Sequence, residues 1–164
     1  MQKDNSSMKT KNKPTLVYGI GNSGRQDDGL AWLFIDHLLS QDSFKGISFE
    51  KNYQLNIEDA ALIAKYDTVV FVDACSERNV KTFSYNKITP HPTTSFSSHE
   101  LSCESVLALC HEMYNNEVEA YLLAIKGYEW ELIDKLTAKA QDNLEKALAF
   151  FKKQNFSTLE CISK

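Results

Sequence analysis

The 164-residue sequence contains no apolar run that approaches the roughly 20 residues of a transmembrane helix, which argues against a membrane span. Its first 14 residues are polar and lack the apolar centre of a signal peptide. An excess of positive charge is also missing, because the net charge is −4 and acidic and basic residues are interleaved. The chain therefore has no electrostatic footprint for nucleic acid or an anionic membrane. We expect a cytoplasmic protein with one domain at residues 15–153, flanked by a flexible tail at 1–14 and a C-terminal tail at 154–164.

Common cysteine and metalloprotease signatures are missing as well. There are four cysteines but no C-x-x-C pair, and there is no H-E-x-x-H motif. Cys103 and Cys110 fall within an apolar helical pattern, which favours buried free thiols over a disulfide or a zinc site in a reducing compartment. The sequence also offers no Cys–His pair that we would assign as a catalytic nucleophile and its base.

What the sequence does contain is a regular alternation of strand and helix patterns. The unbroken apolar run at Val69–Val72 indicates a strand buried on both faces, as in a parallel sheet, whereas residues 81–88 alternate like an edge strand. This order predicts a single-domain three-layer α/β/α sandwich with a mainly parallel sheet and an antiparallel edge strand. Ligands of such sheets bind beyond the carboxyl ends of the strands. The expected strands are 15–19, 46–53, 67–74, 81–88 and 119–127, and the expected helices are 28–39, 57–65, 99–113 and 137–153, the last capped by Thr137.

The glycine-rich segment "GIGNSGRQDDG", residues 19–29, fits the G-x-G-x-x-G pattern of dinucleotide-binding turns. Two features disfavour a nucleotide-binding function. Asp27 and Asp28 would repel the pyrophosphate at close range, and the acidic residue required at the end of the next strand is not there, because Glu50 lies inside that strand. The segment is better suited to attract a cation.

Asp27 and Asp28 require different explanations. An aspartate is a favoured helix N-cap, and we expect Asp27 to cap the helix at 28–39. Asp28 is then left at the junction between strand and helix, beside Gly29. Asp73 ends the apolar strand at 67–74, so it should emerge at the same edge of the sheet as Asp28. The two carboxylates together predict a cation site.

A histidine is the natural third ligand, and the loop after residue 88 offers two. His99 is expected to open a helix, with a capping box at 97–100, whereas His91 lies between two prolines in the preceding loop. We favour His99 because a helix start places a side chain more rigidly. His37 and His111 lie on helices and are better explained as surface or packing residues. Two carboxylates and one imidazole suit Ni²⁺, Zn²⁺ or a similar first-row ion.

Three segments in this order and spacing resemble the hydrogenase maturation proteases: "GIGNSGRQDDG" at 19–29, "VVFVDA" at 69–74 and "SHELSCESVLAL" at 98–109. The resemblance runs from about Thr15 to Leu148, and "KGYEWELIDKLT" at 126–137 is similar to the family's loop before the last helix. Such endopeptidases remove a C-terminal extension from the large subunit of nickel–iron hydrogenase. The resemblance implies that Asp28, where many relatives have glutamate, binds the metal together with Asp73 and His99.

The same resemblance implies the roles of the site residues. Nickel would be supplied by the precursor of the large subunit, with zinc or cadmium as substitutes in crystals. Asp28 and Asp73 would serve in catalysis, and Gly21, Asn22 and Asp27 would contact the substrate. Metal-assisted activation of water or of the scissile carbonyl is the expected chemistry, with the general base left open.

The segment at 52–60 differs from the glycine pair of many relatives, which leaves the identity of the hydrogenase open. Two other functions also stay open at this point. One is a metal-sensing maturation factor that binds a metalloprotein precursor without cutting it. The other, less favoured, is a nucleotide-binding protein that uses the loop at Gly19–Gly24.

Overall fold

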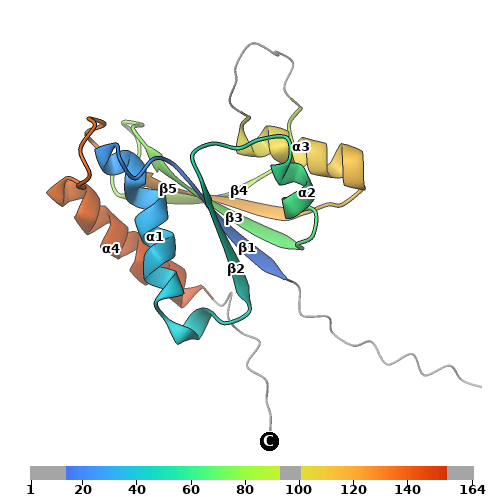
Figure 1. Ribbon diagram of the computed structural model, residues 1–164, viewed down its shortest axis with the longest axis horizontal. Coiled ribbons are helices and arrows are strands. Elements are labelled where there is room, and N and C mark those ends of the chain that lie inside the picture. Colours follow the sequence, from blue (N-terminus) through green and yellow to red (C-terminus); the bar gives the residue numbers. More distant parts are fainter. Residues whose placement is uncertain (1–13, 93–100, 155–164) are drawn as a thin grey trace, which may run out of the picture.

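Five strands form one sheet within the described residues of the computed structural model, which are 14–92 and 101–154. The strand order is β2-β1-β3-β5-β4, and all neighbouring pairs are parallel except β4 and β5 (Figure 1). The edge strand β4 is therefore antiparallel, as its alternating sequence predicted. The strands are β1 (Thr15–Ile20), β2 (Ile47–Asn52), β3 (Thr68–Cys75), β4 (Phe83–Ile88) and β5 (Glu119–Lys126).

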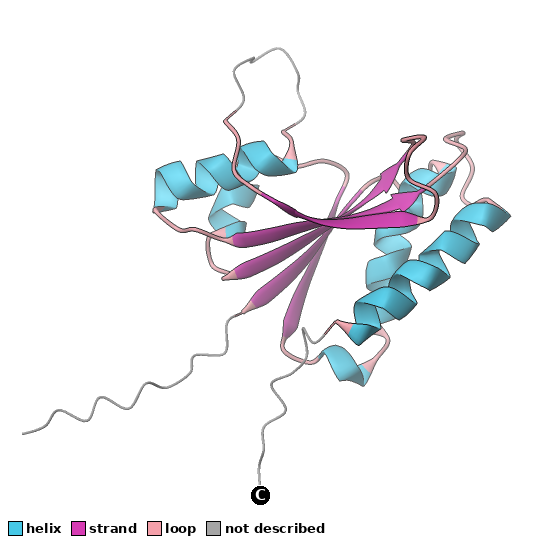
Figure 2. Cartoon of the chain, turned by 180° about the vertical axis from the view of Figure 1, so that it is seen from behind, coloured by secondary structure: helices cyan, strands magenta, loops and turns pink. Residues whose placement is uncertain are grey.

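Helices cover both faces of this sheet (Figure 2). One hydrophobic cluster joins the sheet to α1 (Leu30–Leu39) and α4 (Ala138–Lys153), and a second joins the opposite face to α2 (Asp59–Ile63) and α3 (Cys103–Tyr114). Val70 and Val72 belong to the first cluster, while Val69 and Phe71 belong to the second. The strand β3 is thus buried on both faces, and the predicted three-layer α/β/α sandwich is confirmed.

Three helices begin later than the sequence pattern predicted: α1, α3 and also α2, which begins at Asp59 instead of residue 57. A 3₁₀ turn, η1 (Gln26–Gly29), precedes α1, and Gly29 occupies the N-cap position of α1 without a side-chain cap. The prediction that Asp27 caps this helix is therefore wrong. α3 begins at Cys103 with Ser102 as its N-cap, so the prediction that His99 opens this helix is also wrong. The predicted capping box at 97–100 and His99 lie outside the described residues.

The last helix agrees with the sequence pattern in detail. Thr137 is the N-cap of α4, and its hydroxyl accepts a hydrogen bond from the Ala140 N–H at 3.2 Å. The apolar stripe of α4 is buried against α1, where the rings of Phe151 and Phe34 pack edge to face at 5.4 Å. A second 3₁₀ turn, η2 (Asp42–Phe44), connects α1 to β2. None of the described helices combines the length and the apolar composition needed to cross a bilayer.

Candidate functional site

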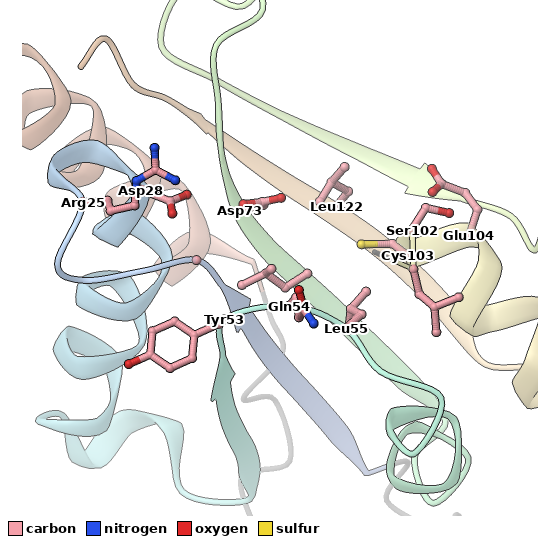
Figure 3. A pocket seen from close by; sticks show the side chains of 13 residues that line it. Arg25, Asp28, Tyr53, Gln54, Leu55, Asp73, Ser102, Cys103, Glu104 and Leu122 are labelled. Carbon is pink, nitrogen blue, oxygen red and sulfur yellow. The ribbon is translucent and has the colours of Figure 1, made fainter. Parts of the chain in front are cut away.

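A cleft of about 550 Å³ lies at the edge of the sheet formed by the carboxyl ends of β1 and β3. In Figure 3, Arg25 and Asp28 enter it from the turn after β1, Asp73 from β3, and Cys103 and Glu104 from the start of α3. The cleft therefore spans the distance between the glycine-rich loop and the first turn of α3. Among the residues that the structure describes, those that line it are Ile20, Gly21, Arg25, Asp28, Tyr53, Gln54, Leu55, Asp73, Leu101, Ser102, Cys103, Glu104 and Leu122.

Asp73 reaches this cleft because of the register of the central strands. It pairs with Ile20, the last residue of β1, and with Ala124 of β5. Asp73 is the first polar residue after the fully buried run at Val69–Val72, and it is itself half-buried. The structure thus brings Asp28 and Asp73 to one edge of the sheet, in the same cleft, as the sequence pattern predicted.

The backbone of the glycine-rich loop fixes the position of Asp28. The Asn22 N–H donates to both the carbonyl oxygen and the Oδ2 atom of Asp28, each at 3.1 Å. Gly21 has φ of +148°, and a Cβ on it would lie 2.1 Å from the Asp28 carbonyl oxygen. Only glycine allows this close approach.

The same hydrogen bonds leave the loop poorly suited to a pyrophosphate. Besides the Asn22 N–H, which binds Asp28, the Gly24 N–H donates to the Asn22 side-chain oxygen at 2.9 Å and the Gly21 N–H to the Asn52 carbonyl at 3.1 Å. A phosphate-binding loop instead directs its backbone N–H groups toward the ligand. The geometry thus agrees with the charge argument against a nucleotide.

Asp27 has a position quite unlike that of Asp28. Its side chain is fully buried and accepts hydrogen bonds from the backbone N–H groups of Tyr128, Glu129 and Thr137, at 2.8, 3.1 and 2.8 Å. The Thr137 hydroxyl donates to it as well, at 2.8 Å. Asp27 therefore ties the segment before α4 to the turn after β1, and a direct contact with substrate would require these bonds to break. The predicted substrate-binding roles of Gly21, Asn22 and Asp27 stay predictions.

The histidine side of the site is only partly described. His99 lies outside the described residues, and the alternative, His91, is exposed, with its backbone N–H bonded to the Glu104 carbonyl at 3.0 Å. Within residues 14–92 and 101–154, no three His, Cys, Asp or Glu side chains come together to hold a metal ion. Asp28 and Asp73 thus form a pair of carboxylates whose third ligand stays a prediction.

Several residues of the cleft could not be identified from the sequence alone. Cys103 was expected to be a buried free thiol, which is confirmed, but it also lines the cleft. Burial raises the pKa of this thiol well above its usual range, and the nearby carboxylates of Asp73 and Glu104 raise it further. Cys103 is therefore a protonated thiol at neutral pH and unsuited to be a nucleophile. Tyr53, in the segment after β2, also lines the cleft, at a position that no local pattern marks.

Solved structures of other proteins share this fold. No family model and no curated protein matches the sequence, but several solved structures match the chain over most of its length. The hydrogenase maturating endopeptidase HybD from E. coli has a TM-score of 0.68 at 19% identity, over 84% of this chain and 88% of that one. The NiFe hydrogenase maturation protease HycI from Thermococcus kodakarensis KOD1 has a TM-score of 0.66 at 20% identity, over 85% and 90% of the two chains. A hydrogenase 2 maturation peptidase from a Thaumarchaeota archaeon has a TM-score of 0.62 at 16% identity, over 85% and 95%. The fold implied by the sequence resemblance is confirmed.

Proposed function

We propose that this protein is a hydrogenase maturation endopeptidase that removes the C-terminal extension from a nickel-loaded large-subunit precursor. The observation that carries the proposal is the meeting of Asp28 and Asp73 in one cleft at the carboxyl edge of the sheet. The fold is shared with solved structures named as hydrogenase maturation proteases, and the segments that hold both aspartates resemble that family. A cytoplasmic location stays a prediction.

In this proposal the nickel ion arrives as part of the substrate. Asp28 and Asp73 supply carboxylate oxygens to the ion, and His99 is the proposed third ligand. Docking is then strengthened by metal–ligand bonds that a metal-free precursor cannot form. Proteolysis is thereby coupled to successful loading of the metal.

The cleft has room for more than a metal ion. One water takes up about 30 Å³ of the liquid, so a volume of about 550 Å³ accommodates a stretch of peptide beside the ion. The apolar side chains of Ile20, Leu55 and Leu122 line the same cleft and can pack against such a peptide. The scissile bond would then lie near the metal, whose charge polarises the carbonyl or activates a water.

The direct test is to mix the protein with a nickel-loaded precursor and with a metal-free precursor, and to measure the mass of the large subunit. We expect loss of the extension from the nickel-loaded form only. Cleavage of neither form, across cognate candidates, would remove the protease proposal. A stable complex without loss of the extension would instead identify a metal-sensing maturation factor.

Two variants test the assignment of the carboxylates. Asp28→Asn and Asp73→Asn should abolish processing while the circular dichroism spectrum and the thermal unfolding transition stay close to those of the wild-type protein. Asp42→Asn is the matched control, because the Asp42 side chain is 94% exposed and lies on η2, outside the cleft. Processing at the wild-type rate by both site variants would show that the catalytic site lies elsewhere.

A further inference from the structure

The segment between β5 and α4, residues 127–137, contains no helix or strand, yet its backbone is held at many points. Three consecutive residues hold it: Arg25, Gln26 and Asp27. Besides the four hydrogen bonds that Asp27 accepts, the Gln26 N–H donates to the Ile133 carbonyl at 2.8 Å, and Gln26 Oε1 accepts from the Glu131 N–H at 2.9 Å. Arg25 Nη2 donates to the Trp130 carbonyl at 3.4 Å. A loop fixed in this way is rigid.

Packing and backbone strain support the same conclusion. Gln26 adopts φ of +45°, an unfavourable conformation for a residue other than glycine. At Gly127, a Cβ would lie 2.8 Å from Asp27 Cβ and 2.9 Å from the Trp130 ring, so the loop lies directly against the turn. Backbone strain of this kind persists only where the surrounding contacts enforce it, and it concentrates at functional sites.

The tip of this rigid loop presents apolar side chains to solvent. Leu132 is 84% exposed and Ile133 is 50% exposed. Charged, exposed residues surround them in sequence: Glu129, Glu131, Asp134 and Lys135. An apolar centre with a polar rim is the usual composition of a protein–protein interface, and a rigid apolar anchor loses little conformational entropy on binding.

The loop also lies beside the cleft. Arg25 both lines the cleft and bonds to the loop backbone, and the next two residues link the loop to Asp28. In Figure 1 the orange segment before α4 stands next to the blue start of η1 and α1. A protein bound to this tip would have its neighbouring segments within reach of the carboxylates.

From these observations we infer that residues 128–135 form a preorganised docking platform, with Leu132 and Ile133 as anchors for the folded body of the precursor. The inference rests on the proposed function for the identity of the partner. Because the rim carries three acidic residues and one basic residue, the matching surface on the precursor is an apolar pocket bordered by basic side chains. The cleft then receives the metal and the extension, while the platform recognises the body.

The test measures the dissociation constant for the nickel-loaded precursor by calorimetry, with wild-type protein and with Leu132→Ser and Ile133→Ser. Because both side chains are exposed, the substitutions should leave the unfolding temperature unchanged. We expect Leu132→Ser to weaken precursor binding by about tenfold or more, as replacement of an interface anchor does. Leu39→Ser is the matched control, because Leu39 is 57% exposed at the opposite end of α1 from η1, and it should bind as the wild type does.

The outcomes separate this inference from the proposed function. Unchanged binding by both loop variants would overturn the docking platform, even if the wild-type protein processes the precursor. Weakened binding with no processing by the wild-type protein would support the platform and refute the protease. If the precursor does not bind at all, or if the loop variants instead abolish self-association of the wild-type chain in sedimentation, the platform does not serve the precursor and the inference fails.

Discussion

Replacement of Asp27 by asparagine tests how the segment before α4 is held. In the folded protein Asp27 is fully buried, and its Oδ2 atom accepts from the Tyr128 N–H, the Glu129 N–H and the Thr137 hydroxyl, while Oδ1 accepts from the Thr137 N–H. Asparagine has almost the same shape but offers one oxygen in place of two. The least costly orientation keeps the amide oxygen at the Oδ2 position and directs the amide NH₂ at the Thr137 N–H.

The size of the effect follows from these contacts. An unsatisfied buried donor costs about 1–3 kcal/mol, and each bond that loses a charged acceptor weakens by about 1 kcal/mol. With three such bonds remaining, Asp27→Asn should lower the free energy of unfolding by roughly 4–6 kcal/mol, a large part of the roughly 5–15 kcal/mol that folded domains have. The loss can be smaller if the loop detaches and water reaches the freed N–H groups, because the cost then cannot exceed the free energy of opening the loop.

Urea unfolding and amide hydrogen exchange distinguish these two outcomes. In the first outcome, the free energy of unfolding obtained from the urea curve falls by the full predicted amount. In the second, the amides of Tyr128, Glu129 and Thr137 lose protection from exchange while the amides of the sheet retain it. Asp142→Asn is the control, because Asp142 forms only an exposed pair with Lys146 on α4 and should change the free energy of unfolding by about 0.5 kcal/mol or less. A shift below about 1 kcal/mol for Asp27→Asn, with all three amides still protected, would refute this description of the turn.

Two further perturbations have defined outcomes. Gly21→Ala should lower the free energy of unfolding, measured with urea, by roughly 2–4 kcal/mol and should impair processing, because the new Cβ would displace the Asp28 carbonyl. Gly46 also has a positive φ, of +97°, but a Cβ there would meet no atom within 4 Å. If Gly46→Ala lowered the free energy of unfolding as much as Gly21→Ala, the steric argument would be contradicted. Burial raises the pKa of Cys110 from 9.0 to about 11, so the stability that this thiol contributes is present below pH 9.0 and is lost as the pH rises toward 11. Between pH 9.0 and 11, the urea concentration at the unfolding midpoint should therefore fall less for Cys110→Ala than for the wild-type protein. Midpoints that fall equally with pH in the two proteins would contradict the raised pKa of Cys110.

The positions of the strands, and the burial of β3 on both faces, could be predicted well from the sequence. A strand such as β3 is specified by its own composition, since four consecutive apolar residues must be covered on both faces. The position of Asp73 followed from the same pattern, because a carboxylate cannot continue such a buried run without a partner and marks the end of the apolar section. Topology then places the ends of β1 and β3 side by side.

The helix starts could not be predicted with the same accuracy, because several residues near each start are chemically able to cap it. Ser97 and Ser102 are both favoured N-cap residues, and only the structure shows that the Ser102 hydroxyl accepts from the Ser105 N–H at 3.1 Å. Leu101, just before this cap, forms an isolated antiparallel bridge with Leu55. That bridge is a tertiary contact between segments far apart in the sequence, and it is beyond the reach of a local pattern.

The pair Asp27 and Asp28 shows the same limit within the site. The prediction correctly treated them as having different roles, but it assigned Asp27 to the nearest helix end, because local patterns reveal only nearby donors. Its actual donors, the N–H groups of Tyr128, Glu129 and Thr137, lie about a hundred residues away in the sequence. Only a tertiary contact could bring them to the turn.

This division between the two aspartates also explains why adjacent negative charges can stand at the start of a helix. The 3₁₀ turn directs Asp27 inward, where three backbone N–H groups and a hydroxyl surround its carboxylate, and leaves Asp28 on the wall of the cleft. Their charges therefore act on different surroundings, since one holds the loop at 127–137 and the other faces the proposed metal-bearing substrate. Because the two residues share one short turn, a displacement of the loop would move Asp28 as well. The proposed docking site at the loop and the Asp28 carboxylate in the cleft are thus connected through η1.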